Sequence, residues 1–391
     1  MSARPPLVIL GNPENRRVEF ALRAAGSLGW RGVRTVPWLA FLTDPAILAD
    51  ELRPDGWLRI ESPGENFEVE KALLRIGASG ANEHGFDWID ADAIDALPFR
   101  RGQILPMRQW YLGWRIALQW VARHLARAKG SRAMNPPADI AAMFDKARCH
   151  EILAAAGVPL PRLLGLPVSY EHLREIMRAA GRGRVFLKPC HSSSASGVVA
   201  LEAGRTGIQA FSSVELAGET GRLDLFNSLT VRRYRNPRQI VELVDAVCRQ
   251  RSIAEQWFPK AGHDGQRFDL RVLVIEGRSA HVVMRQSAGP ITNLHLGNRR
   301  GDLAGLRQRM GDAKWQGAMD VAERAARAFP GSLYVAVDLL MSPEFRQFVV
   351  AEVNAFGDLL PNLLHDGRDT YATELARLLE SPPAQVSTSG W

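Results

Sequence analysis

The sequence contains few cysteines and no long apolar run. Cys149, Cys190 and Cys248 are the only cysteines among its 391 residues, and no C-x-x-C spacing occurs. This odd, dispersed set predicts neither a disulfide framework nor a zinc site. No run of 18 apolar residues is present, and the first six residues lack the apolar stretch of a secretory signal. We therefore expect a cytoplasmic protein without membrane partners.

Acidic residues are missing between Ala96 and Ala138, a segment that carries eight lysines and arginines. The whole chain has 49 basic against 42 acidic residues, a net charge of +7, so the remainder is close to neutral. The basic character therefore belongs to one segment and does not predict a nucleic-acid-binding surface.

The basic segment has the periodicity of an amphipathic helix that ends before Asn135-Pro136-Pro137. One face carries apolar residues and the other carries arginines: Trp110, Trp114, Ala117, Leu118, Val121 and Leu125 against Arg108, Arg115, Arg123 and Arg127. Two interpretations stay open. The segment is either a connecting helix with a solvated arginine face or a docking surface for an acidic ligand or peptide.

The N-terminal part has the pattern of a small α/β domain that extends to about Leu97. An apolar run over 7–10 breaks at Gly11-Asn12-Pro13 and is followed by apolar residues at helical spacing over 18–28. Short strands are expected at 33–36 and 57–60. The first turn lacks G-x-G-x-x-G, so no glycine pattern supports a dinucleotide site.

The rest of the chain predicts a mixed α+β structure. Helices are expected over 140–156 and from Asn236-Pro237 onward, where an N-cap and a first-turn proline stand together. Strands are expected at 185–189, 198–201, 271–275 and 281–284, and the runs 333–341 and 348–354 flank Ser342-Pro343 as a hairpin.

A lysine followed by a loop of small residues is the first candidate for chemistry. Lys188 ends a predicted strand, and Ser192 to Gly197 follow, including Ser193, Ser194, Ser196 and Gly197. Small side chains let backbone N–H groups approach a polyphosphate while the lysine supplies positive charge, although such a loop is also compatible with a flexible surface turn. A second lysine, Lys146, begins the helix upstream. His191 follows Cys190 directly before this loop, and the sequence leaves two roles for it, a contact to phosphate or a loop histidine without a ligand.

Three oxygen-bearing side chains on the predicted hairpin form a candidate metal site. Asp338 lies in an otherwise apolar strand, and Glu352 and Asn354 are two residues apart on the next one, so they share a face. Magnesium prefers carboxylate and amide oxygens together with substrate phosphates. The run Ile253 to Phe258 could hold a flat base through its backbone.

Together these motifs resemble the ATP-grasp superfamily, and within it the branch of glutathione synthetase and the ribosomal-protein glutamate ligase. The resemblance covers about Asp139 to Leu378. It rests on the order of six motifs: FDKARCHEILAAAGVPLP, VFLKPCHSSSASGVV, IAEQWF, FDLRVLVIEGRSAHVVMRQ, TNLHLGNRRGD and VAVDLLM followed by VVAEVNAFG.

The resemblance implies roles for residues and a division of the chain. ATP would lie between two α+β subdomains, with Lys146 and Lys188 on phosphates, Arg271 near the γ-phosphate, Arg285 near the reacting carboxylate and Asn293 in a closing loop. The adenine would lie against Glu255, Gln256, Trp257 and Phe258, and two magnesium ions would be held by Asp338, Glu352 and Asn354. The divisions are an α/β pre-grasp domain over 1–98, a connecting helix over 99–138 and subdomains over 139–252 and 253–391, with an insertion at about 201–236.

The implied activity is an ATP-dependent carboxylate–amine ligase that works through an acyl phosphate and releases ADP. A kinase of the same fold and a non-catalytic ATP-binding module are the alternatives. Two departures from the family pattern leave the carboxylate and the amine open: Ile291 stands where glutathione synthetases carry a substrate-binding arginine, and 355–361 replace the usual turn after Asn354. A small-molecule or peptide carboxylate fits, and a homo-oligomer is compatible with the sequence.

Overall fold

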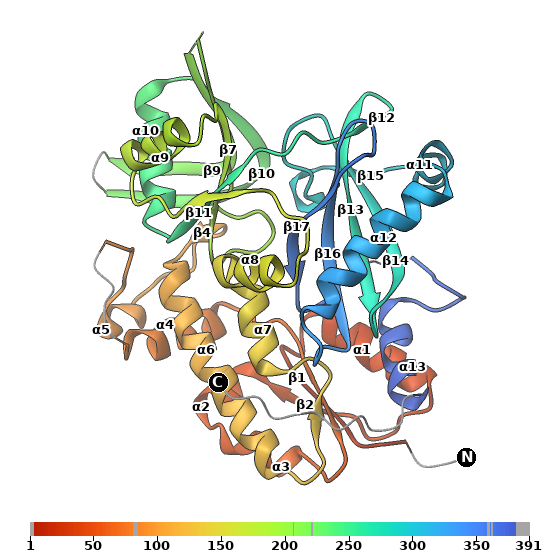
Figure 1. Ribbon diagram of the computed structural model, residues 1–391. Coiled ribbons are helices and arrows are strands. Elements are labelled where there is room, and N and C mark those ends of the chain that lie inside the picture. The colour runs from red at the N-terminus through yellow and green to blue at the C-terminus, as the bar shows by residue number, and fades with distance from the viewer. Residues whose placement is uncertain are drawn as a thin grey trace.

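The computed structural model describes residues 4–80, 85–205, 207–219, 222–357, 360 and 363–380. Three sheets organise this part of the chain, and Figure 1 shows the N-terminal sheet below the two antiparallel ones. None of the helices in the described ranges is long and apolar enough to cross a bilayer. The three cysteines are unpaired and buried.

The N-terminal region is a parallel sheet with helices on it, as the alternation of short apolar runs and helical periodicity predicted. Its strand order is β2-β1-β3-β5. The strands are β1 (Leu7–Gly11), β2 (Arg34–Pro37), β3 (Trp57–Ile60) and β5 (Arg132–Ala133). The helices are α1 (Arg16–Ser27), α2 (Trp38–Thr43), α3 (Ala46–Glu51), α4 (Phe67–Ala78) and α5 (Ala91–Ile94).

The basic segment forms α6 (Met107–Arg127), whose apolar face is buried against α4 and α7 (Pro137–Phe144). The helix ends at Arg127 rather than at the Asn135 to Pro137 motif, because β5 intervenes. Arg115, Arg123 and Arg127 are exposed. Arg108 is only 8% exposed and lies 6.0 Å from the Tyr111 ring, so its expected place on the solvated face is wrong.

The helix expected over 140–156 is two helices, α7 and α8 (Lys146–Ala155), with a break at Asp145. Asp145 leaves the helical conformation and accepts hydrogen bonds from the backbone N–H groups of Ala147 and Arg148. The break therefore produces an N-cap directly before Lys146.

The second sheet is antiparallel, with the order β4-β10-β9-β8-β7-β11-β6. Its strands are β4 (Gln103–Ile104), β6 (Leu163–Gly165), β7 (Arg184–Pro189), β8 (Val199–Gly204), β9 (Gly207–Glu219), β10 (Arg222–Tyr234) and β11 (Ser252–Gln256). Helices α9 (Tyr170–Ala179) and α10 (Pro237–Cys248) pack on it. The insertion expected at 201–236 is thus an integral hairpin of this sheet.

The third sheet contains the predicted hairpins and has the order β15-β14-β13-β16-β17, with β12 beside β13. Figure 1 shows α12 running across it. Its strands are β12 (Gly262–His263), β13 (Gln266–Ile275), β14 (Arg278–Ser287), β15 (Arg299–Arg300), β16 (Tyr334–Met341) and β17 (Phe348–Asn354). The remaining helices are η1 (Leu294–Leu296), α11 (Leu303–Met310), α12 (Asp312–Arg327) and α13 (Thr370–Glu380).

A buried ionic cluster joins the first and third sheets to α13. Arg59 of β3 contacts Glu61 at 2.6 Å and Glu374 of α13 at 2.7 Å, and all three side chains are almost wholly buried. The guanidinium also lies over the rings of Tyr334 and Tyr371, at 4.9 and 4.6 Å. Burial raises the pKa of Glu374 to about 7 although Arg59 opposes the shift.

Candidate active site

A cavity lies between the second and third sheets and encloses about 760 Å³ of space, including the part open to solvent. Its walls include nine of the residues singled out from the sequence: Lys146, Lys188, Glu255, Gln256, Phe258, Arg285, Asn293, Asp338 and Glu352. Residues far apart in the chain are therefore brought to one place.

Lys146 stands at the start of α8 and reaches across the cavity to the third sheet. Its ammonium lies 3.0 Å from Glu352 Oε1 and donates to the carbonyl of Ser192 at 2.5 Å. Its backbone N–H donates to the carbonyl of Cys190. The capping residue Asp145 contacts His191 Nε2 at 3.2 Å, so the helix start and the small-residue loop are held together.

His191 is a structural residue of this loop and does not line the cavity. Its ring stacks on Tyr111 with a centroid separation of 4.0 Å. Burial lowers the pKa of His191 to about 4 although Asp145 favours the charged form. Burial therefore favours the neutral imidazole, whose ring contacts are with Asp145 and Tyr111.

Lys188 emerges from β7 beside β11. Its ammonium donates to Glu255 Oε2 at 2.6 Å and to the Ala351 carbonyl at 3.4 Å. Burial alone would lower the pKa of this lysine, but Glu255 and the more distant Glu352 raise it. Lys188 is therefore a permanent positive charge inside the cavity.

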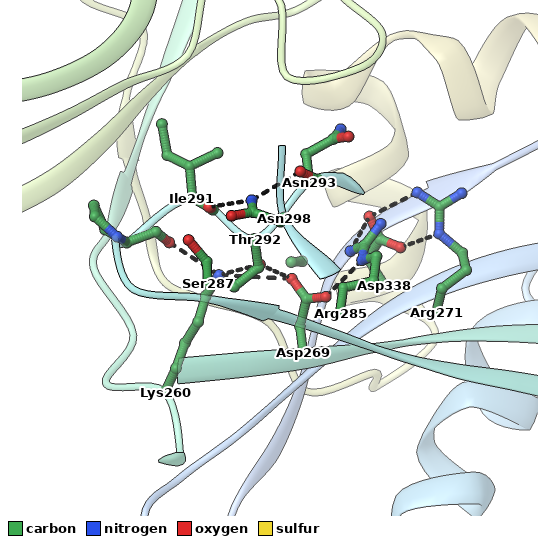
Figure 2. A network of polar contacts seen from close by, with 12 residues as sticks. Lys260, Asp269, Arg271, Arg285, Ser287, Ile291, Thr292, Asn293, Asn298 and Asp338 are labelled. Carbon is green, nitrogen blue, oxygen red and sulfur yellow. Dashed lines mark hydrogen bonds and ion pairs between the residues drawn. The ribbon is translucent and has the colours of Figure 1, made fainter. Parts of the chain in front are cut away.

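Two arginines converge on Asp338, as Figure 2 shows. Register places Arg271 opposite Asp338 and Asp269 opposite Arg285. Arg271 contacts Asp338 through both Nε and a terminal nitrogen, while Arg285 reaches Asp338 at 3.0 Å and Asp269 at 2.6 Å. Burial by itself favours the protonated acid, but the two guanidinium groups hold the pKa of Asp338 below its usual value.

The candidate magnesium ligands lie on adjacent strands. Asp338 is directly opposite Glu352 in the β16–β17 register, and both line the cavity. Asn354 does not line it, and its Nδ2 is buried without a hydrogen-bond partner. No group of three or more His, Cys, Asp and Glu residues in the described ranges is arranged to hold a metal by itself. Two facing carboxylates fit magnesium, which takes its other oxygens from phosphates and water, whereas the unpaired Nδ2 of Asn354 is a donor and only its Oδ1 could serve as a ligand.

The small-residue loop contributes to the cavity through other members than those expected. Ser192, Ala195 and Val198 line it, whereas Ser193, Ser194, Ser196 and Gly197 do not. Gly197 has φ +76°, and a Cβ there would lie 2.6 Å from Pro189 Cγ. The glycine is therefore needed to turn the loop tightly against β7.

The expected adenine segment is split between the cavity and its outside. Glu255, Gln256 and Phe258 line the cavity, but Trp257 does not. The Trp257 ring instead packs against Phe186, with centroids 5.0 Å apart, and Phe186 is itself part of the wall. Trp257 thus supports an apolar wall suited to a flat ring.

Sequence reasoning missed Lys260, Asp269 and Thr292, which also line the cavity. Asp269 could have been predicted, because it lies two residues before Arg271 in the same strand and alternate residues of a strand share a face. Lys260 carried a weaker signal, a lone cation within the run WFPKAG. Thr292 carried none, since it lies in a loop without periodicity.

The architecture, two antiparallel sheets around a cavity with a preceding α/β region, is that of the ATP-grasp fold, and solved structures agree. The chain is similar to the ATP-grasp ligase PsnB complexed with precursor peptide PsnA2 and AMPPNP, at 15% identity over 97% of this chain and 98% of that one, with a TM-score of 0.52. It is similar to D-cycloserine synthetase DcsG at 14% identity, 95% and 99% coverage and a TM-score of 0.53.

A third structure, the ADP complex of the N5-carboxyaminoimidazole ribonucleotide synthetase PurK, is 12% identical over 98% of this chain and 78% of that chain, with a TM-score of 0.54. No family model and no curated protein matches the sequence. At these identities the likeness shows the fold, and the finer placement beside glutathione synthetase stays a prediction.

Proposed function

We propose that this protein is an ATP-dependent ligase that joins a carboxylate to an amine and releases ADP and phosphate. The observation that carries the proposal is the cavity wall itself: Lys146, Lys188 and Arg285 line it, together with the facing carboxylates of Asp338 and Glu352. PsnB and DcsG, which share the fold, are named a ligase and a synthetase, and the PsnB structure contains AMPPNP.

In the proposed reaction the substrate carboxylate attacks the γ-phosphorus of ATP, the bond to ADP breaks, and an acyl phosphate forms. The amine then attacks the acyl carbon, loses a proton and expels phosphate. Both partners of the first step are anionic, so fixed cations lower its barrier by charge stabilisation and positioning. Lys146 and Lys188 would bind phosphates, and Arg285 with Arg271 beside it would orient the carboxylate and stabilise the transferring group.

Asp338, Glu352 and Asn354 would hold magnesium, which supplies charge neutralisation on the phosphates. We propose two ions, as in the family resemblance. Pairing of Asp338 with two arginines and of Glu352 with Lys146 holds these carboxylates in place.

Coupled ADP release over a panel of carboxylates and amines, followed by product mass, tests the activity. Hydroxylamine should intercept the acyl phosphate as a hydroxamate. A stable phosphorylated product without an amide would instead favour a kinase, and AMP with pyrophosphate would contradict the proposal.

Magnesium-ATP is expected to stabilise the wild-type protein by about 2.7 kcal/mol at 100 times its Kd. Lys188→Ala and Glu352→Gln should each weaken binding at least tenfold and remove about 1.4 kcal/mol of that gain. Melting with and without magnesium-ATP measures the gain within each variant, so altered stability of the free protein cancels.

The exposed Lys314→Ala serves as the matched control. EDTA should reduce the ATP-dependent shift in the wild type. A full shift in both site variants would refute the nucleotide assignment.

For the substrate, we propose a small-molecule or peptide carboxylate, and that the exposed arginines of α6 dock an acidic one. Arg115, Arg123 and Arg127 follow one another at multiples of four residues and therefore form a stripe along the helix. Charge reversal with Arg115→Glu and Arg123→Glu should raise the KM of an acidic peptide at least fivefold and flatten its salt dependence, while the KM of ATP is unchanged.

Arg324→Glu with Arg327→Glu on α12 makes the same charge change on another exposed surface and is the matched control. An unchanged peptide KM in the α6 variant, or an equal rise in the control, would return α6 to a structural role.

A further inference from the structure

The segment that follows β14 forms part of the cavity wall and is held from two sides. Pro290, Ile291, Thr292 and Asn293 line the cavity. On one side Ile291 packs with Val198 and Leu296 in a small apolar cluster. On the other side Lys260, Asp269 and Thr292 form a polar network, drawn in Figure 2.

Lys260 is a buried lysine whose donors are used within the protein. Its side chain is 8% exposed, and its ammonium donates to the Thr292 hydroxyl at 2.7 Å and to the Pro290 carbonyl at 3.1 Å. Asp269 Oδ2 lies 3.6 Å away. An ammonium has three N–H groups, and three protein acceptors surround it. Lys260 is thus placed to hold the 290–292 backbone rather than to bind substrate.

Asp269 connects this lysine to the candidate catalytic arginine. Its Oδ2 accepts the Thr292 hydroxyl and faces Lys260, while its Oδ1 accepts Arg285 Nε at 2.6 Å. One carboxylate therefore joins the loop to the guanidinium. If the loop moved away, Asp269 would lose the partners of one oxygen and its hold on Arg285 would change.

We propose that Lys260 is a positioning residue, which through Thr292 and Asp269 fixes both the 290–293 wall and the orientation of Arg285. The part that concerns Arg285 rests on the proposed function. The chain of contacts from Lys260 through Thr292 and Asp269 to Arg285, here called the relay, couples the position of the loop to the orientation of the arginine. The carboxylate substrate therefore meets a correctly oriented Arg285 only when the 290–293 segment is in place.

Hydrogen–deuterium exchange of the peptide that covers 288–298 tests the loop half of the proposal in the free full-length protein. Lys260→Met keeps the length of the side chain and removes its donors, and Thr292→Val removes only the hydroxyl. Each should speed exchange in this peptide at least fivefold. Thr292→Ser retains the hydroxyl and should restore the wild-type rate, and the exposed Lys314→Met is the matched control.

The double variant separates a relay from two independent contacts. In a relay, Lys260→Met with Thr292→Val should exchange within twofold of the faster single variant, whereas independent contacts would multiply the two effects. Exchange in either single variant within twofold of wild type, a multiplicative double, or Thr292→Ser as fast as Thr292→Val would overturn the proposal.

Turnover tests the Arg285 half with the carboxylate and amine found by the ADP-release screen. Thr292→Val should lower kcat/KM for the carboxylate at least tenfold, Thr292→Ser should restore it, and the KM of ATP should stay within twofold. An unchanged kcat/KM in Thr292→Val would overturn the link to Arg285. Failure of the wild type with every pair would count against the proposed function, while the exchange data would still decide the role of Lys260.

Discussion

Arg285→Ala is expected to lower kcat by at least about 1,000-fold, which corresponds to ~4 kcal/mol of lost transition-state stabilisation. The guanidinium is buried between Asp269 and Asp338 at the cavity wall. Water that entered after its removal would stabilise the negative charge of the transition state less well than this fixed cation does. Its contribution belongs mainly to the transition state, so ATP affinity should stay within about tenfold. Arg271→Ala should act in the same direction, since Arg271 holds the other side of Asp338.

Single-turnover kinetics with hydroxylamine trapping measures the first step directly. Arg278→Ala, an exposed arginine on the same strand as Arg285, is the matched control and should turn over normally. Retention of more than a tenth of wild-type kcat in Arg285→Ala would remove this residue from the mechanism.

Arg59→Met is expected to lower the free energy of unfolding by about 3–5 kcal/mol at pH 8. The substitution keeps the bulk of the side chain but leaves Glu61 and Glu374 buried without their cation. Burial on folding already raises the pKa of Glu374 from its ordinary 4.5 to about 7. The folded state thus favours the neutral acid. The contribution of Glu374 to the free energy of unfolding is therefore present at low pH and is lost as the pH rises through about 7.

The loss in Arg59→Met should therefore be smaller at pH 5.5 than at pH 8, as measured by denaturant unfolding at both values. Adding Glu374→Gln should recover part of the loss at pH 8. Arg34 lies in the same sheet as Arg59 and forms an exposed pair with Glu51 of α3, so Arg34→Met should leave the free energy of unfolding almost unchanged. If Arg59→Met lowered the free energy of unfolding as little as Arg34→Met, the ion pairs of Arg59 with Glu61 and Glu374 would not be what stabilises the cluster.

Much of the fold was predictable where apolar periodicity and turn residues agree. The strand over 57–60, the helix start at Asn236-Pro237 and the hairpin of β16 and β17 are confirmed with almost unchanged limits. The apolar pattern continues through Asp145 and does not mark the break, but the prediction that a helix begins at Lys146 is confirmed. What interrupts the helix is a side chain that caps α8 and contacts His191, 46 residues away.

The candidate site was predictable to the extent that residues were fixed by strand register. Hairpin turns set the register of Asp269 with Arg285 and of Asp338 with Glu352. The β13–β16 pairing that brings Arg271 to Asp338 is not fixed by a turn. Contacts made by loops were not predictable in this way, and Lys260 with Thr292 is the example. Arg108 shows a further limit, since helical periodicity gives the angular position of a residue but not what packs over it.

The two short strands that flank α6 belong to different sheets: β4 pairs with β10 in the second and β5 pairs with β3 in the first. A chimera that joined the N-terminal region of a relative to this chain at either end of α6 would pair the relative's β4 with this chain's β10 and the relative's β3 with this chain's β5. The N-terminal region is therefore not an exchangeable module, and recombination between relatives would have to carry 1–133 as a block together with a matching β10.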